Sequence, residues 1–180
     1  MVGFISLADA KIHLKVEDDS EDGLITSLIL AASAHVEEVT GLVCPVRAGE
    51  AFAFDGFPRR EFVLRRRPIA AESVSVSYVD PAGDPQTFDE LRIVERGGLT
   101  RVCPGVGAAW PVAACVRAAV TISADVGFAA ATDAVPSSAP ADVKHAVRLL
   151  VGHLFGDREG ESKLPSAIAQ LLHAHRIIRV

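Results

Sequence analysis

Residues 22–41 read DGLITSLILAASAHVEEVTG, and they carry the clearest helical pattern in the 180-residue sequence. Apolar and small residues recur there at steps of three and four, which is the spacing of one face of an α-helix. The residues on this face are Leu24, Leu28, Ala31, Ala32, His35, Val36 and Val39. Gly41 follows them, and glycine readily ends a helix in the left-handed conformation. We therefore predict a helix with one buried face that ends before Gly41.

An acidic run precedes this helix. Five of the six residues from 17 to 22 are acidic, namely Glu17, Asp18, Asp19, Glu21 and Asp22. Negative charge is favourable beside the unpaired N–H groups of a helix N-terminus. The spacing Asp18-x-Ser20-x-Asp22-Gly23 also matches the first half of a calcium-binding EF-hand loop, but Ile29 stands where that loop needs a bidentate Glu. We therefore interpret the run as helix-capping acids rather than as a calcium site.

Helical patterns occupy both ends of the chain. Ser6 followed by Asp9 resembles a capping box and predicts a short helix through about Lys15. Pro140 fits the first turn of a later helix, and Leu164-Pro165 opens a last one. The apolar stripe of the helix after Pro140 consists of Val143, Val147, Leu150, Val151 and Leu154.

Between residues 44 and 127 the pattern changes from helical to alternating. Strands are expected over residues 51–54, 61–64, 73–79, 87–94 and 116–124. Residues 73–79 alternate strictly, so one face of that strand should be buried and the other exposed. The Ala/Ser/Pro-rich residues 128–139 are expected to form a linker. We predict an α+β fold in which residues 1–43 and 128–180 form one helical bundle, with residues 44–127 inserted as a small antiparallel β subdomain.

Composition excludes several classes of protein. With 49% apolar and 23% charged residues the chain is typical of a globular domain, and its apolar runs are too short to cross a bilayer. The N-terminus lacks the pattern of a signal peptide. The net charge of −5 comes from residues 1–43, which hold 8 acidic and 2 basic side chains. This is the opposite of the basic footprint of a protein that grips nucleic acid.

No group of residues argues for catalysis, a metal or a cofactor. The six histidines lack a metal-ligand spacing, and His173-x-His175 suits a helix C-terminus. The three cysteines are an odd number without a CxxC pair, as expected for free thiols. Gly97-Gly98 lacks the Lys-Ser/Thr of a phosphate loop, and we interpret Arg65–Arg67 as a solvated strand end. Trp110 is expected to anchor its loop to the core.

Several segments, in order, resemble the head–tail connector (head-completion adaptor) proteins of tailed phages, prophages and gene transfer agents. The resemblance begins with ISLADAKIHLKV at residues 5–16 and continues through residues 22–41. It extends to the hairpin at residues 73–87, to Trp110-Pro111, to Val135-Pro136 and to Leu164-Pro165 with Leu171-Leu172 and Arg176.

The resemblance implies a structural virion protein rather than an enzyme. Such proteins form a ring, usually of twelve copies, between the portal and the tail or stopper protein, and the ring extends the channel for double-stranded DNA without binding it sequence-specifically. It implies no cofactor and no membrane, and a place in the neck of a virion or phage-like particle assembled in the bacterial cytoplasm.

Two segments are then expected to make contacts in the assembled ring. The acidic run is expected to face the DNA channel or a neighbouring subunit, because like charges would let the duplex slide. The apolar and basic C-terminal segment is expected to dock on the portal or on a neighbour, and it consists of Arg176, Ile177, Ile178, Arg179 and Val180.

The chain has 28 Ala but only 10 aromatic residues, which favours finishing its burial against other subunits. Close helix approach between subunits is expected at Ala31, Ala32, Ala34, Ala146, Ala167 and Ala169.

Three other functions are compatible with the residues. The first is another head or tail completion protein. The second is a small cytosolic enzyme that uses His35 or His145 beside a carboxylate. The third is a nucleic-acid regulator that uses Arg59-Arg60 and the Arg65–Arg67 run.

Overall fold

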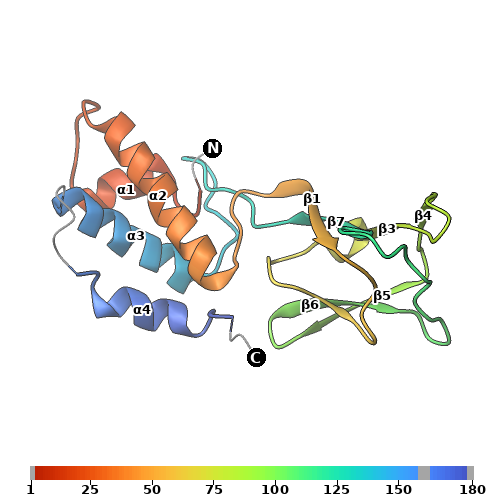
Figure 1. Cartoon of the computed structure of the whole chain (residues 1–180). Coiled ribbons are helices and arrows are strands. Elements are labelled where there is room, and N and C mark those ends of the chain that lie inside the picture. The colour runs from red at the N-terminus through yellow and green to blue at the C-terminus, as the bar shows by residue number, and fades with distance from the viewer. Residues whose placement is uncertain (1–2, 158–162, 178–180) are drawn as a thin grey trace. The chain divides into compact units, whose positions relative to one another are not determined.

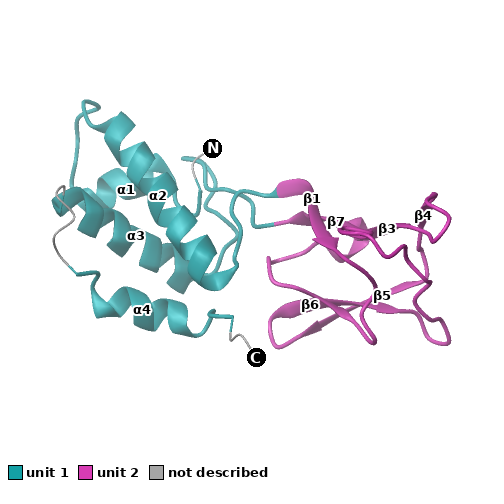
Figure 2. Ribbon diagram, viewed as in Figure 1, with its two compact units in different colours: residues 1–46, 127–180 teal, residues 47–126 magenta. Residues whose placement is uncertain are grey.

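The computed structural model describes residues 3–157 and 163–177. Within them the chain has four α-helices and two small antiparallel sheets, so the predicted α+β class is confirmed (Figure 1). The chain divides into two compact units. Unit 1 comprises residues 1–46 and 127–180, and unit 2 comprises residues 47–126 (Figure 2).

Unit 1 contains the helices α1 (Leu7–Leu14), α2 (Asp22–Thr40), α3 (Ala141–Gly156) and α4 (Ser166–His173). The Ser6 hydroxyl accepts a hydrogen bond from the Asp9 amide at 3.1 Å, which caps α1 as its sequence predicts. Gly41 ends α2 with a φ of 71°, in the left-handed region. All four helices contribute to one apolar core, whose members include Phe4, Ile5, Ile25, Ile29, Val36, Val147, Leu150, Ile168 and Leu172.

Unit 2 contains a sheet of four strands in the order β1 (Arg47–Phe54), β7 (Val120–Val126), β3 (Ser75–Val79) and β4 (Pro85–Thr87). Its second sheet has the order β2 (Phe62–Leu64), β6 (Leu99–Pro104) and β5 (Leu91–Arg96). Burial alternates along β7, because one face of that strand points into the unit.

Unit 2 holds an aromatic cluster formed by Phe54, Phe57, Phe62, Tyr78, Phe88 and Trp110. The Trp110 ring stacks on Phe57, with ring centroids 5.0 Å apart and an interplanar angle of 21°. The Trp110 Nε1–H group donates to the Arg60 carbonyl at 3.3 Å. Trp110 therefore anchors its loop to the core, as predicted.

Three sequence predictions in this region were wrong. Residues 87–94 do not form one strand, because β4 belongs to the first sheet and β5 to the second. The strand expected from residue 116 begins only at Val120. Strand β6 was not predicted, although Gly97 and Gly98, both with positive φ, form its hairpin turn with β5.

The segment of residues 128–139 is also not a free linker. The Ser137 hydroxyl donates to the Ala129 carbonyl at 2.8 Å, and the Ala131 amide donates to the Gly3 carbonyl at 3.0 Å. Ala131, Ser137 and Ala139 are buried. This segment is packed into unit 1 by its own hydrogen bonds.

Candidate interaction surfaces

The acidic run folds back on α1 through Lys11. The Lys11 ammonium lies 2.6 Å from an Asp19 oxygen and 2.8 Å from an Asp22 oxygen. These hydrogen bonds, first to Asp19 and then to Asp22, raise the pKa of Lys11 above its ordinary value. Through these two carboxylates Lys11 joins α1 to the start of α2.

Asp18 turns its carboxylate toward its own loop. It accepts hydrogen bonds from the Ser20 hydroxyl and from the Ser20 amide, the latter at 2.9 Å. These two bonds lower the pKa of Asp18. Glu17, Asp18 and Asp19 are exposed, so the run presents negative charge to solvent.

The capping role expected of the acids is met only in part. Asp22 lies in the first turn of α2, where its charge favours the helix. The N-cap residue, Glu21, makes no side-chain capping hydrogen bond. The main structural partner of the run is therefore Lys11 rather than the helix N-terminus.

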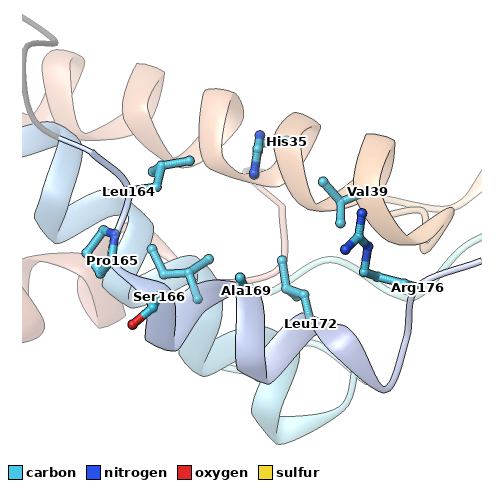
Figure 3. A pocket seen from close by; sticks show the side chains of 9 residues that line it. His35, Val39, Leu164, Pro165, Ser166, Ala169, Leu172 and Arg176 are labelled. Atoms are coloured by element: carbon cyan, nitrogen blue, oxygen red, sulfur yellow. The ribbon is translucent and has the colours of Figure 1, made fainter.

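A pocket of about 210 Å³ lies between α2 and α4 in unit 1 (Figure 3). Figure 3 shows His35 and Val39 on α2 facing Ala169 and Leu172 on α4. The residues that line it, all within the described ranges, include no carboxylate. His35 therefore lacks here the acid partner that the enzyme alternative would need, and His145 is exposed on α3.

The described part of the C-terminal segment begins beside this pocket. Arg176 lines the pocket and is exposed, and Ile177 is half-buried. Ile178, Arg179 and Val180 lie outside the described residues. Just before the segment, the His175 Nε2 atom lies 2.7 Å from an Asp142 oxygen, which joins the end of α4 to the start of α3.

The Asp142 carboxylate is stabilised in its charged form. Partial burial raises the pKa of Asp142, but the hydrogen bonds from His175 and from the Val143 amide outweigh that effect. The pKa of Asp142 therefore lies below its ordinary value. His175 therefore contacts a carboxylate on another helix. The interpretation of His173-x-His175 as cations at a helix C-terminus did not include this contact.

A long apolar loop of residues 105–119 is the surface feature that sequence reasoning missed. Val106, Val112 and Val116 in this loop are 96%, 74% and 53% exposed. Arg117 is the one charged residue of the loop. Connecting segments are usually polar and surface-exposed, so a long connection with few charges could have indicated an exposed apolar surface.

The loop is nevertheless held firmly in unit 2. Its Gly105 amide donates to the Glu90 carbonyl at 2.7 Å, and its Ala114 amide donates to the Val79 carbonyl at 2.8 Å. The Ala118 amide donates to an Asp55 oxygen at 2.9 Å. Together with the anchored Trp110, these bonds fix the backbone while the valine side chains point outward. We call residues 105–119 the Trp110 loop.

The other candidate groups have structural roles. Arg66 lies 2.9 Å from a Glu50 oxygen, and Arg67 donates to the Gly98 carbonyl at 3.0 Å. The Arg65–Arg67 run is therefore partly used within unit 2 rather than fully solvated. The described residues hold no cluster of three or more His, Cys, Asp or Glu that could bind a metal ion, and none of their helices is long and apolar enough to cross a membrane.

The alanine positions expected at subunit contacts divide into two groups. Ala32 and Ala146 are fully buried in the core of unit 1, so that part of the prediction was wrong. Ala31, Ala34, Ala167 and Ala169 are exposed on α2 and α4.

Comparison with protein families gives a match for the N-terminal part of the chain. Residues 4–59 match the family of phage gp6-like head-tail connector proteins. A comparison by sequence with curated proteins gave no match.

Three solved structures are similar to nearly the whole chain. A chain of the virion of a native gene transfer agent (GTA) particle aligns with a TM-score of 0.76 and 26% identity, over 97% of this chain and 90% of that chain. A chain of the neck of a native GTA particle computed with C12 symmetry aligns with a TM-score of 0.73 and 26% identity, over 97% and 89%. A chain of the neck of an empty GTA particle computed with C6 symmetry shares the fold, with a TM-score of 0.75 and 24% identity over 97% and 90%.

Residues 4–59 therefore match the head–tail connector family, and nearly the whole chain shares the fold of chains from gene transfer agent particles.

Proposed function

We propose that this protein is a head–tail connector that forms a homo-oligomeric ring in the neck of a phage-like particle, between the portal and the tail or stopper protein. The observation that carries the proposal is the likeness of 97% of the chain to a chain in a neck computed with C12 symmetry. A ring adaptor needs contact surfaces rather than catalytic groups. Unit 1 exposes the acidic run and unit 2 exposes the apolar Trp110 loop, and both are suited to such contacts. Double-stranded DNA would pass through the ring without sequence-specific binding.

Cryo-electron microscopy of the assembled particle tests this function directly. The chain is expected as one ring of the neck, next to the portal. A position in the tail tube or on the capsid surface would contradict the connector role. Native mass spectrometry of the purified chain, alone and with its portal, gives the copy number, for which twelve is expected.

We propose that the helices from both chain ends (residues 1–43 and 128–180) act as one helical bundle, with the β subdomain (residues 44–127) inserted in the chain between them. The shared apolar core of α1, α2, α3 and α4 supports this arrangement. Replacing residues 47–126 with a short Gly/Ser linker should leave a folded helical protein. Loss of helical circular dichroism in that variant would contradict the proposal.

The acidic run, Glu17–Asp22, is proposed to face the DNA channel or a neighbouring subunit. Its exposed acids, Glu17, Asp18 and Asp19, support either role, because they repel phosphate and attract a basic partner. A ring that places the run on the outer rim, away from DNA and from the neighbours, would contradict this proposal.

The C-terminal segment, Arg176–Val180, is proposed to dock on the portal or on an adjacent subunit. The exposed Arg176 and the His175–Asp142 contact that positions it support this role. Deleting residues 176–180 should abolish attachment to portal-bearing heads while leaving the helical content intact. The matched control is a point variant at Arg96, an exposed cation in unit 2. Unchanged attachment of the truncated chain would refute the docking role.

A further inference from the structure

We propose that the Trp110 loop, with the basic residues beside it, docks on the acidic end of unit 1 of a second copy of this chain. This inference rests on the proposed ring and names the two surfaces that would form its repeating contact. A cyclic ring of identical subunits is built from a heterologous interface, in which two different patches of the chain meet. The two patches must therefore complement each other in charge and in apolar area.

The first patch is apolar at its centre and basic at its edge. Val112 and Val116 project from a backbone that is already fixed, so docking would cost little loop ordering. Arg60 contributes its carbonyl to the Trp110 indole, which places Arg59 and Arg60 beside the loop. Arg117 lies within the loop, next to the Ala118 amide that Asp55 binds.

These three arginines are available for a partner. Arg59, Arg60 and Arg117 are exposed, and none of them forms an ion pair among the described residues. One acid beside the loop, Asp55, accepts a hydrogen bond from the Ala118 amide at 2.9 Å. The patch therefore presents three exposed arginines, none of them in an ion pair among the described residues, around exposed valines.

The second patch has the opposite character. Ile12 on α1 is 78% exposed, which is unusual for an isoleucine. Lys11, the preceding residue, binds Asp19 and Asp22, so the acidic run folds against the same end of α1. Glu17, Asp18 and Asp19 are exposed there, and residues 1–43 carry an excess of acids over bases. This patch offers an apolar side chain bordered by negative charge.

A second copy fits better than DNA as the partner of each patch. An exposed isoleucine and an acidic border offer nothing to a polyanion, and although the arginines of the first patch could contact phosphates, the exposed valines at its centre could not. Each patch instead supplies what the other lacks, and both lie on one chain. Of the two roles proposed above for the acidic run, this assigns it to the neighbouring subunit.

Disulfide cross-linking tests the contact with a cysteine that the chain already has. Cys115 is exposed in the Trp110 loop between Val112 and Val116, whereas Cys44 and Cys103 are buried. In the Ile12→Cys variant, mild oxidation of the rings should produce a ladder of covalent multimers larger than dimers. Adding Cys115→Ser to that variant should reduce the ladder to dimers at most. Leu30→Cys, at an exposed apolar position on α2, is the matched control and should give no ladder.

The outcomes separate the two proposals. Rings seen by native mass spectrometry without a ladder would overturn this interface and leave the proposed ring intact. No ring, either with the chain alone or with its portal, would overturn the ring and the interface together. A ladder that survives Cys115→Ser would also overturn the pairing.

Charge reversal gives an independent test. Arg59→Glu/Arg60→Glu and Glu17→Lys/Asp18→Lys should each weaken self-association at least tenfold, because each places like charges at every contact. Mixed in equal amounts, the two variants should assemble again as alternating rings. Arg65→Glu/Arg96→Glu, at exposed arginines beside the β5–β6 turn, is the control and should assemble normally. Assembly of each reversed variant alone, or failure of the mixture to assemble, would overturn the interface.

Discussion

Trp110 is the residue on which the Trp110 loop depends most. Its ring contacts Phe57 at 5.0 Å, Phe88 at 5.2 Å and Phe62 at 5.3 Å between centroids, and its Nε1–H group donates to the Arg60 carbonyl. A tryptophan side chain buries about 200 Å² when packed, and burial contributes about 25 cal/mol per Å². Trp110 is only partly buried, so about three quarters of that area gives roughly 4 kcal/mol.

Trp110→Ala is therefore expected to lower the free energy of unfolding of the full chain by about 3–5 kcal/mol, within the range for large aromatic truncations. Trp110→Phe keeps most of the stacking but loses the hydrogen bond to Arg60, and should lower the free energy by about 1–2 kcal/mol. Val112→Ala is the control, because Val112 is 74% exposed, and its effect should stay within about 0.5 kcal/mol.

Urea unfolding followed by far-ultraviolet circular dichroism measures these differences without using the tryptophan itself as the probe. The same variants should be compared for self-association by sedimentation. A loss below about 1 kcal/mol for Trp110→Ala would show that the aromatic cluster does not hold the loop. Normal stability with lost assembly would show that Trp110 acts at the interface instead of behind it.

Three further perturbations test other parts of the structure. Gly127→Ala should destabilise the protein by about 2 kcal/mol or more, because φ is +122° and the added Cβ would lie 3.0 Å from the Pro45 carbonyl oxygen. Gly83→Ala is the control, because its added Cβ meets open space. In thermal unfolding this control should show only the smaller cost of its positive φ. Ser6→Ala should cost about 1 kcal/mol by removing the cap of α1, measured as the loss of stability against an unchanged helix content of the folded state. Asp142→Asn should cost less than about 1 kcal/mol because the carboxylate is 40% exposed. Folding lowers the pKa of Asp142, so the stability that its carboxylate contributes should be full above the ordinary carboxyl pKa and should disappear as pH falls through the lower folded value. Melting temperatures of the wild type and of Asp142→Asn, measured from pH 3 to 6, test this. A difference in melting temperature that does not change with pH would contradict the role of the Asp142–His175 contact.

The helices of unit 1 were predictable because their signals are local. Ser6 caps α1 and Gly41 ends α2 as the sequence predicts, since a capping oxygen and a left-handed glycine act within one turn. Pro140 and Pro165 likewise stand at the N-caps of α3 and α4. The α+β class followed from the change of hydrophobic period.

The sheets were less predictable because their pairing is set by distant residues. Thr87 and Leu91 are four positions apart, yet they join different sheets, a division that no local period records. Strand β6 did have a local signal, because the Gly97-Gly98 pair suits a tight hairpin turn and both residues have positive φ. The early start assigned to β7 reflects the apolar residues of the Trp110 loop, which resemble a strand in composition but are exposed.

The candidate surfaces divide in the same way. The acidic run is visible in the sequence, but its link to Lys11 depends on a fold-back that charge counting does not reveal. The Trp110 loop was missed because exposure is a property of the folded chain. Its valines have the composition of a core strand, but in the folded chain their side chains are exposed while hydrogen bonds to Glu90, Val79 and Asp55 hold the backbone.

The insertion of unit 2 within unit 1 has a consequence for how the chain is made. Helix α2 ends at Thr40 and α3 begins at Ala141, so 100 residues (41–140) must be synthesised before α2 meets its main partner. At ribosomal rates of roughly 5–20 residues per second, the apolar face of α2, with Ile25, Ile29 and Val36, stays uncovered for about 5–20 s. Unit 2 is contiguous and can complete its own core during that interval. The nascent chain therefore passes through a stage with a finished β subdomain and an open helical face, and that stage is where a chaperone or premature self-association would act on it.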